Sequence, residues 1–142
     1  MTTVVLPHAP ASVGAARRHM ITELTCRGVP APVVDDAALV LSELVGNAVR
    51  HGSPLPGGGV EVTWRRDGAV VHLEVCDGGG GPAGVAAEGG PRESSSTTAE
   101  GGRGLAIVSR IAVAWGRQVR DGVTCVSAEL RVPVAESDAA TG

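Results

Sequence analysis

The chain has 142 residues, of which 43% are hydrophobic and 19% are charged, and its formal net charge is −3. This length and composition predict one globular domain that is large enough to bury a core. The negative charge and the near absence of aromatic residues argue against nucleic-acid binding, which relies on basic surfaces and stacking. The longest apolar runs, such as Ala37–Leu41, are too short to span a membrane.

The N-terminus and the cysteines favour a cytoplasmic location. The opening residues, MTTVVLPHAP, lack the basic segment and the long apolar run of a secretory signal. Cys26, Cys76 and Cys125 form no CxxC pair and are widely separated, which argues against a disulfide framework or a zinc site. We therefore expect reduced, largely buried thiols in a cytoplasmic protein.

A strand and a helix are expected at the start of the chain. Thr2–Leu6 is short and β-branched, which favours a strand. After a Pro-rich break, Ser12 is expected to cap a helix that runs to about Thr25. Gly28 and Pro30 end this helix.

The next helix is the clearest element of the sequence. It is expected from about Val33 to His51, where apolar residues recur at the spacing of one helical face. These residues are Ala37, Val40, Leu41, Leu44, Val45 and Ala48. Gly52 and Pro54 end the helix.

Two hairpins follow, separated by a Gly-rich segment. Asp67-Gly68 and Asp121-Gly122 are hairpin signals, each between two alternating strands. Between the hairpins, the composition of Gly78–Gly104 is typical of a functional lid or a disordered loop, and a short helix is expected from Arg103 to about Ile111.

The order of these elements predicts an α+β fold. We expect a two-layer α/β sandwich in which a mixed, mostly antiparallel sheet is covered by helices on one face. The domain is expected to span residues 1–133, and residues 134–142 to form a polar, disordered tail.

Polar residues on the second helix are candidates for chemistry. Glu43 and Asn47 are four residues apart and point the same way, away from the apolar stripe, with Arg50 below them. A solvated face with a Glu–Arg pair would explain Glu43 and Arg50, but asparagine is a poor residue in mid-helix. A carboxylate and an amide oxygen one turn apart can face a hydrated Mg²⁺ and phosphate oxygens.

A second group of candidates lies at the strand ends. Asp77 has the parity of the core-facing valines before it, and a carboxylate on that side needs a partner. Gly78–Gly81 permit a close approach to a ligand, and Thr124 is an inward hydroxyl that could bond the same base as Asp77. A turn capped by Asp77 is the alternative. Glu100–Leu105 leads into a helix, which suits either an anion site or an ordinary Gly-rich helix entry.

Three motifs in this order resemble the boxes of the Bergerat-fold (GHKL) ATPases, the superfamily of gyrase, mismatch-repair ATPases and sensor histidine kinases. The N box reads LSELVGNAVRHG (Leu41–Gly52), the G1 box VCDGGGGPA (Val75–Ala83) and the G2 box EGGRGLAIV (Glu100–Val108). The ELVxNAxRHG pattern, the PASVGAARR start of the first helix and GRGLAIV are most similar to stand-alone anti-sigma factor serine kinases.

This resemblance implies an ATP site and a role for each matching residue. Glu43 would act as general base, and Asn47 would coordinate Mg²⁺. Asp77 would bind the adenine amino group, assisted by Thr124 through water. The G1 and G2 boxes would supply the remaining nucleotide contacts, which are Gly79, Gly81, Gly102, Arg103, Gly104 and Leu105. Because the chain has no lysine, Mg²⁺, a helix dipole and Arg103 would meet the phosphate charge.

The resemblance also implies a function and partners. The first hypothesis is a Mg-ATP-dependent serine/threonine protein kinase that phosphorylates a small antagonist protein and binds a sigma factor. The alternative is a regulatory module that holds nucleotide without phosphoryl transfer, and a free-standing hydrolytic ATPase is a third hypothesis. The resemblance implies a homodimer through the first helix and strand. Arg17 and Arg18 flank the apolar stripe of that helix and are either a docking site or a solvated surface.

Overall fold

The computed structural model describes residues 1–79 and 106–133. The predicted contacts at Gly81, Gly102, Arg103, Gly104 and Leu105 lie outside them, as does the tail. The named elements are β1 (Thr2–Leu6), α1 (Ala11–Cys26), α2 (Ala31–His51), β2 (Val60–Asp67), β3 (Val70–Asp77), β4 (Ala114–Arg120) and β5 (Val123–Arg131). Residues 106–111 are also helical.

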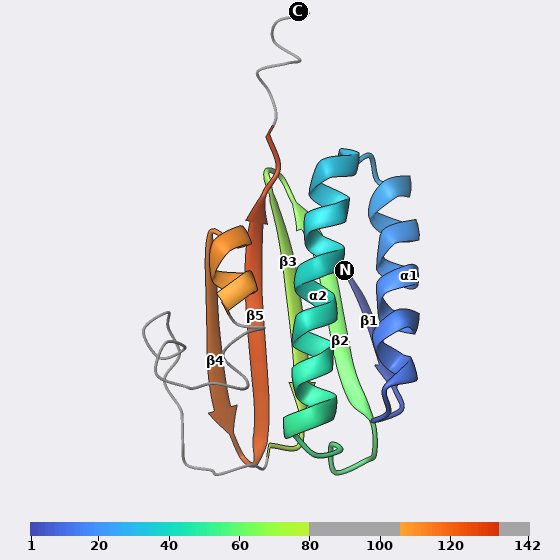
Figure 1. The fold of residues 1–142 in the computed structure, drawn as a ribbon, viewed down its shortest axis with the longest axis vertical. Helices are drawn as coiled ribbons and strands as arrows, with labels where there is room; N and C mark the ends of the chain where they lie inside the picture. Colours follow the sequence, from blue (N-terminus) through green and yellow to red (C-terminus); the bar gives the residue numbers. More distant parts are fainter. Residues whose placement is uncertain (80–105, 134–142) are drawn as a thin grey trace, which may run out of the picture.

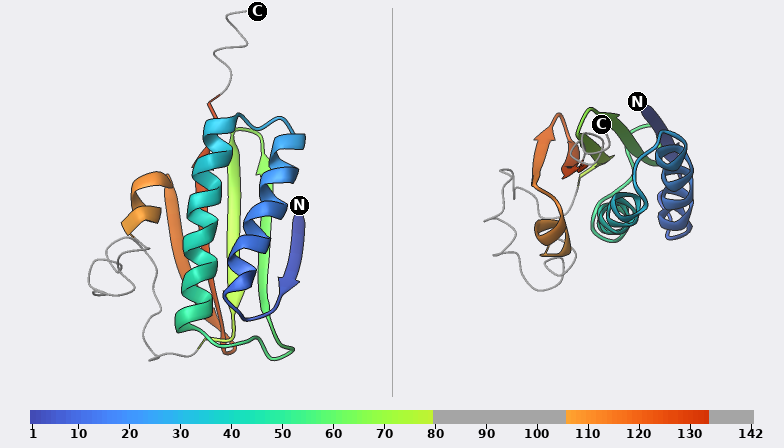
Figure 2. Two further views of the ribbon diagram at one scale, coloured as in Figure 1. Left: turned by 45° about the vertical axis from the view of Figure 1, so that its right-hand side comes forward. Right: turned by 90° about the horizontal axis from the view of Figure 1, so that it is seen from above.

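The strands form one sheet in the order β1-β2-β3-β5-β4, and every neighbouring pair is antiparallel. The helices lie together on one face of this sheet, with α2 between α1 and residues 106–111 (Figures 1 and 2). The predicted α+β sandwich is confirmed. The described strands show no parallel pair, although the sequence allowed a mixed sheet.

Alternation along the strands builds the core against the helices. Val60, Val62 and Trp64 of β2 are at most 1% exposed, and β3 continues the same layer. From the helical side, α1 contributes Met20 and Leu24, which are fully buried. With no Phe or Tyr in the chain, Trp64 is the largest buried side chain, and its Nε1–H donates to the Glu23 carboxylate at 3.2 Å.

Both predicted hairpins are present, but the β2–β3 turn consists of Gly68 and Ala69 and is shifted by one residue from the predicted Asp67-Gly68. Asp67 pairs with Val70, so a two-residue turn begins at Gly68, whose φ is +62°. The β4–β5 turn consists of Asp121 and Gly122, and φ is positive at both. Two positive φ angles match the twist of the flanking strands, which is why Asp-Gly favours this turn.

The predicted cap of the first helix is wrong. Pro10 occupies the N-cap position without a side-chain hydrogen bond, and the helix begins at Ala11. The Ser12 hydroxyl instead donates to the Pro7 carbonyl at 2.5 Å, and Ser12 is buried. The Pro-rich segment folds back over the helix start, so it presents a carbonyl to Ser12 and draws its hydroxyl away from the free N–H groups.

The expectation of unpaired, buried thiols is also wrong. Cys76 of β3 lies opposite Cys125 of β5, with the Cα atoms 4.0 Å apart, and the two form a disulfide. The remaining Cys26 is exposed rather than buried. The spacing of the cysteines in the sequence could not predict this pairing, because the register between β3 and β5 brings the two residues together.

No described helix is long and apolar enough to cross a membrane.

Candidate functional site

The C-terminal end of α2 meets the ends of β3 and β5 at one edge of the molecule (Figure 1). Asp77 is the last residue of β3 and pairs directly with Thr124 of β5. Gly52, which follows the last turn of α2, lies against the Asp77 carboxylate, since a Cβ at Gly52 would be 2.5 Å from Asp77 Cγ. This contact joins the predicted N box to the predicted G1 box.

Asp77 is a buried carboxylate with one oxygen occupied. It is 7% exposed, and the Gly79 N–H donates to its Oδ1 at 2.6 Å. Burial raises the pKa of Asp77, while the Gly79 hydrogen bond and the charges of His8 and Arg117 act in the opposite direction. Among the described residues only Gly79 donates to this carboxylate, so Oδ2 can accept a hydrogen bond from a ligand.

The chain after Asp77 is held between two loops. The Gly78 N–H donates to the Ser53 carbonyl, and the Ser53 hydroxyl donates to the Gly79 carbonyl at 3.0 Å. A side chain at Gly78 would collide with the Pro54 carbonyl. Gly79 has φ +80°, and a Cβ there would lie 3.2 Å from Thr124 Oγ1. Glycine is therefore required at both positions, by close approach at Gly78 and by backbone conformation at Gly79.

Asn47 and Glu43 lie on α2 at increasing distance from Asp77. Asn47 is five positions before Gly52, which corresponds to about 7.5 Å along a helix axis, and Glu43 lies one turn further. Both side chains are partly exposed, beside the buried face that packs on the sheet. The structure thus places the amide, the acidic residue and Asp77 on elements that meet at one edge.

Arg50 contacts Asn47 and not Glu43. Its Nη2 donates to Asn47 Oδ1 at 3.2 Å, and no Glu43–Arg50 ion pair occurs in the part of the chain that the structure describes. The Glu–Arg pair considered from the sequence is therefore not formed. Asn47 Oδ1 is available to a cation once Arg50 moves away, and Arg50 is exposed and free to do so.

Two residues near Asp77 were missed from the sequence. His8 Nε2 lies 2.9 Å from the Ala48 carbonyl of α2, and its charge acts on Asp77. Arg117 of β4 also acts on Asp77. The strand pattern Trp115, Arg117, Val119 could have revealed Arg117, since it places a charge at a position with the parity of the apolar residues. His8 had no comparable signal.

Taken together, the geometry offers a ligand a buried hydrogen-bond acceptor at Asp77, backbone without side chains at Gly78 and Gly79, and on α2 an amide oxygen and a carboxylate of the kind that suits a hydrated cation. Comparison with known proteins agrees with this chemistry. A model of the histidine kinase-like ATPase domain family matches residues 6–130, which include Glu43, Asn47, Asp77 and Thr124. No curated protein is similar enough to the chain to count as a relative.

Proposed function

Because the chain belongs to the family of histidine kinase-like ATPase domains, we propose that it binds Mg-ATP between α2, β3 and β5 and acts as a regulatory serine/threonine protein kinase. ATP binding follows from the family. The kinase activity is our inference, and it is supported by an acidic residue and an amide on the α2 turns nearest the site.

The observation that carries the nucleotide site is the buried carboxylate of Asp77. One oxygen is held by Gly79, and the other can accept a hydrogen bond from the adenine amino group. Thr124, directly opposite Asp77, offers a hydroxyl to the same base. A buried carboxylate that needs a donor discriminates strongly against a base that presents a carbonyl there, so adenine is preferred over guanine.

Asn47 is the residue assigned to Mg²⁺. Its amide oxygen is a ligand type that Mg²⁺ accepts, and its partial exposure leaves room for the water molecules that this ion retains. When bound, the ion would neutralise charge on the phosphate oxygens. Arg50 would leave Asn47 Oδ1, and because that hydrogen bond is exposed its loss costs little.

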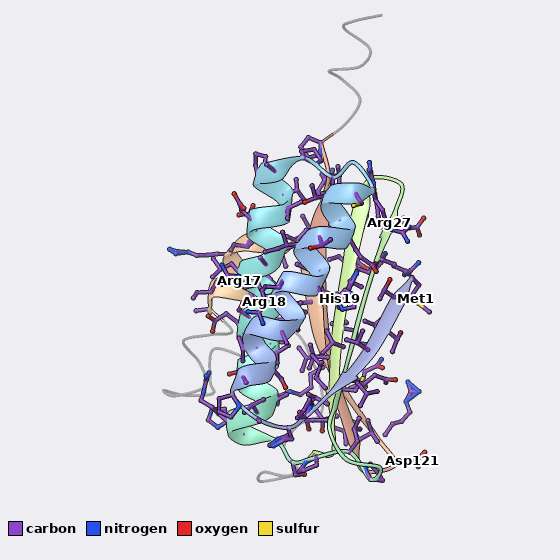
Figure 3. All side chains as sticks on the ribbon, turned by 90° about the vertical axis from the view of Figure 1, so that its right-hand side faces the viewer. Met1, Arg17, Arg18, His19, Arg27 and Asp121 are labelled. Atoms are coloured by element: carbon purple, nitrogen blue, oxygen red, sulfur yellow. A yellow bond between two sulfur atoms is a disulfide. The ribbon has the colours of Figure 1, made fainter. Side chains whose placement is uncertain are left out.

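Glu43 is the residue assigned to proton transfer. The serine hydroxyl of a small antagonist protein would attack the γ-phosphorus, its proton would pass to Glu43, and the bond to the β–γ bridging oxygen would break to release ADP. A sigma factor is the second proposed partner. We also propose a homodimer through β1, an edge strand that exposes Val5, and α1, where Arg17 and Arg18 are exposed (Figure 3).

Transfer of label from γ-labelled ATP to candidate antagonist proteins tests the kinase. Glu43→Gln should abolish transfer and retain ATP binding. Glu61→Gln, on the uncovered face of β2, should leave both unchanged. A Glu43→Gln variant that transfers label at the wild-type rate would remove Glu43 from the chemistry.

The alternative, a non-catalytic regulatory module, is favoured by the partial exposure of Glu43, since the described residues leave its carboxylate in contact with solvent. It predicts that wild-type protein binds ATP and transfers label to none of the candidates.

The proposed kinase would work in the cytoplasm, where thiols are kept reduced. The Cys76–Cys125 disulfide is then expected to open in the cell. Thiol titration of protein purified under alkylating conditions tests this: three reactive cysteines agree with a cytoplasmic location, and one contradicts it.

A further inference from the structure

Arg117 lies on the same face of the sheet as Asp77 and Thr124. On β4 it pairs with Val126 of β5, and Val126 packs against the core beneath the helices. Thr124 pairs with Val119 one step further along β4. Strand alternation therefore directs Arg117 toward the helix-covered side, one step along the sheet from the Asp77–Thr124 pair.

One donor of the Arg117 guanidinium group, the Nε–H, lacks an acceptor within residues 1–79 and 106–133. Arg117 is partly buried, and its Nε is buried with no hydrogen-bond partner among the residues that the structure describes. None of the ion pairs within residues 1–79 and 106–133 involves it. Buried donors in folded proteins are almost always paired, so an unpaired one beside a candidate site indicates an acceptor that arrives with a ligand.

The other basic residues near the site are less suited to hold an anionic group of a ligand. The chain has no lysine. Arg50 is exposed and bonded to Asn47, and Arg120 points to the uncovered face of β4, where it donates to Gln118. Among the arginines of the described site elements, Arg117 is thus the one that is partly buried and lies on the same face of the sheet as Asp77.

We propose that Arg117 contacts the phosphates of the bound nucleotide and sets the preference for triphosphate over monophosphate. This inference rests on the proposed nucleotide site. The base is anchored at the strand end by Asp77, and Arg117 lies two residues, about 6.6 Å, back along the sheet direction and one strand further across. Asn47 lies about 7.5 Å back along α2 from the same end, so Arg117 is displaced in the same direction as the residue assigned to Mg²⁺ (Figure 1). The planar fork of arginine matches phosphate oxygens in geometry and charge.

Calorimetric titration with ATP, ADP, AMP and adenosine tests the proposal on Arg117→Gln and Arg117→Lys. Arg120→Gln is the matched control, since it removes the same charge from the same strand on the opposite face. We expect Arg117→Gln to weaken ATP binding by about tenfold or more and to leave adenosine binding nearly unchanged, because only phosphate offers the charged acceptor. Arg117→Lys should recover part of the loss, and Arg120→Gln should match wild type.

The outcomes separate this inference from the proposed function. If wild-type protein binds none of the four ligands, the nucleotide site itself is wrong. If wild type binds ATP and Arg117→Gln binds it equally well, the site stands and the phosphate contact is wrong. A loss of equal size for adenosine and ATP would also overturn the contact, because it would mean that Arg117 only supports the pocket.

Discussion

Replacing Asp77 with asparagine separates what the carboxylate does for binding from what its burial costs the fold. The substitution preserves shape and leaves an oxygen to accept the Gly79 N–H, now 2.6 Å from Oδ1. It replaces the second acceptor with an amide donor that would oppose the adenine amino group. Losing a hydrogen bond to a charged group costs about 1.5–3 kcal/mol, which corresponds to roughly 10- to 150-fold weaker binding.

The same substitution should not lower the stability of the fold at neutral pH. Burial raises the pKa of Asp77, so the pKa in the folded state lies above that in the unfolded state. A group of this kind contributes stability at low pH, and the contribution is lost as the pH rises through the folded-state pKa. At neutral pH the wild-type protein therefore carries the cost of an ionised, buried carboxylate, and Asp77→Asn should be at least as stable.

Titration with Mg-ATP and thermal unfolding at pH 5 and pH 8, on the same samples, measure both effects. Asp67→Asn is the control, since Asp67 is an exposed carboxylate at the other end of the sheet, where β2 ends. The reasoning fails if Asp77→Asn binds ATP as tightly as wild type. It also fails if the variant is much less stable than wild type at pH 8, because the carboxylate would then stabilise the fold by its charge.

Three further changes test the turn, the core and the disulfide. Gly79→Ala places a side chain at φ +80° and should lower stability by about 1–2 kcal/mol and weaken ATP binding. The control is Gly116→Ala, where a Cβ would meet open space. It should change neither the stability in thermal unfolding nor the affinity in ATP titrations. Trp64→Ala empties the largest buried site and should cost about 3–5 kcal/mol in urea unfolding; a loss under about 1 kcal/mol would contradict the core described above. In a Cys26→Ser background, reductant should lower the unfolding free energy by about 4 kcal/mol, because the disulfide spans 49 residues. Identical curves with and without reductant would mean that the bond adds nothing.

Local signals in the sequence were sufficient for much of the fold. The Asp-Gly turns, the apolar stripe of α2 and the alternation on β3 each act within a few residues, so each could be recognised without tertiary information. The same alternation predicted that Asp77 faces the core, and the structure confirms that it is buried.

What the sequence did not reveal depends on contacts between distant segments. The Ser12 hydroxyl turns to Pro7 because the N-terminal loop folds back, which no capping rule contains. Cys76 and Cys125 meet through the β3–β5 register. The position of Arg117 near Asp77 can be recognised only from the fold, because it depends on the pairing of β3 with β5 and of β5 with β4. Pairing between remote strands is a property of the folded sheet, and a motif cannot encode it.

Backbone amide shifts in a ¹⁵N-labelled sample titrated with Mg-ATP would locate the ligand without any mutation. If ATP binds where α2, β3 and β5 meet, the largest shifts within the described residues fall at Gly52, Gly79 and Thr124. The amide signals of residues on the uncovered face, such as Glu61, should not shift. Shifts concentrated on that face, or none at all at saturating ATP, would contradict the nucleotide site.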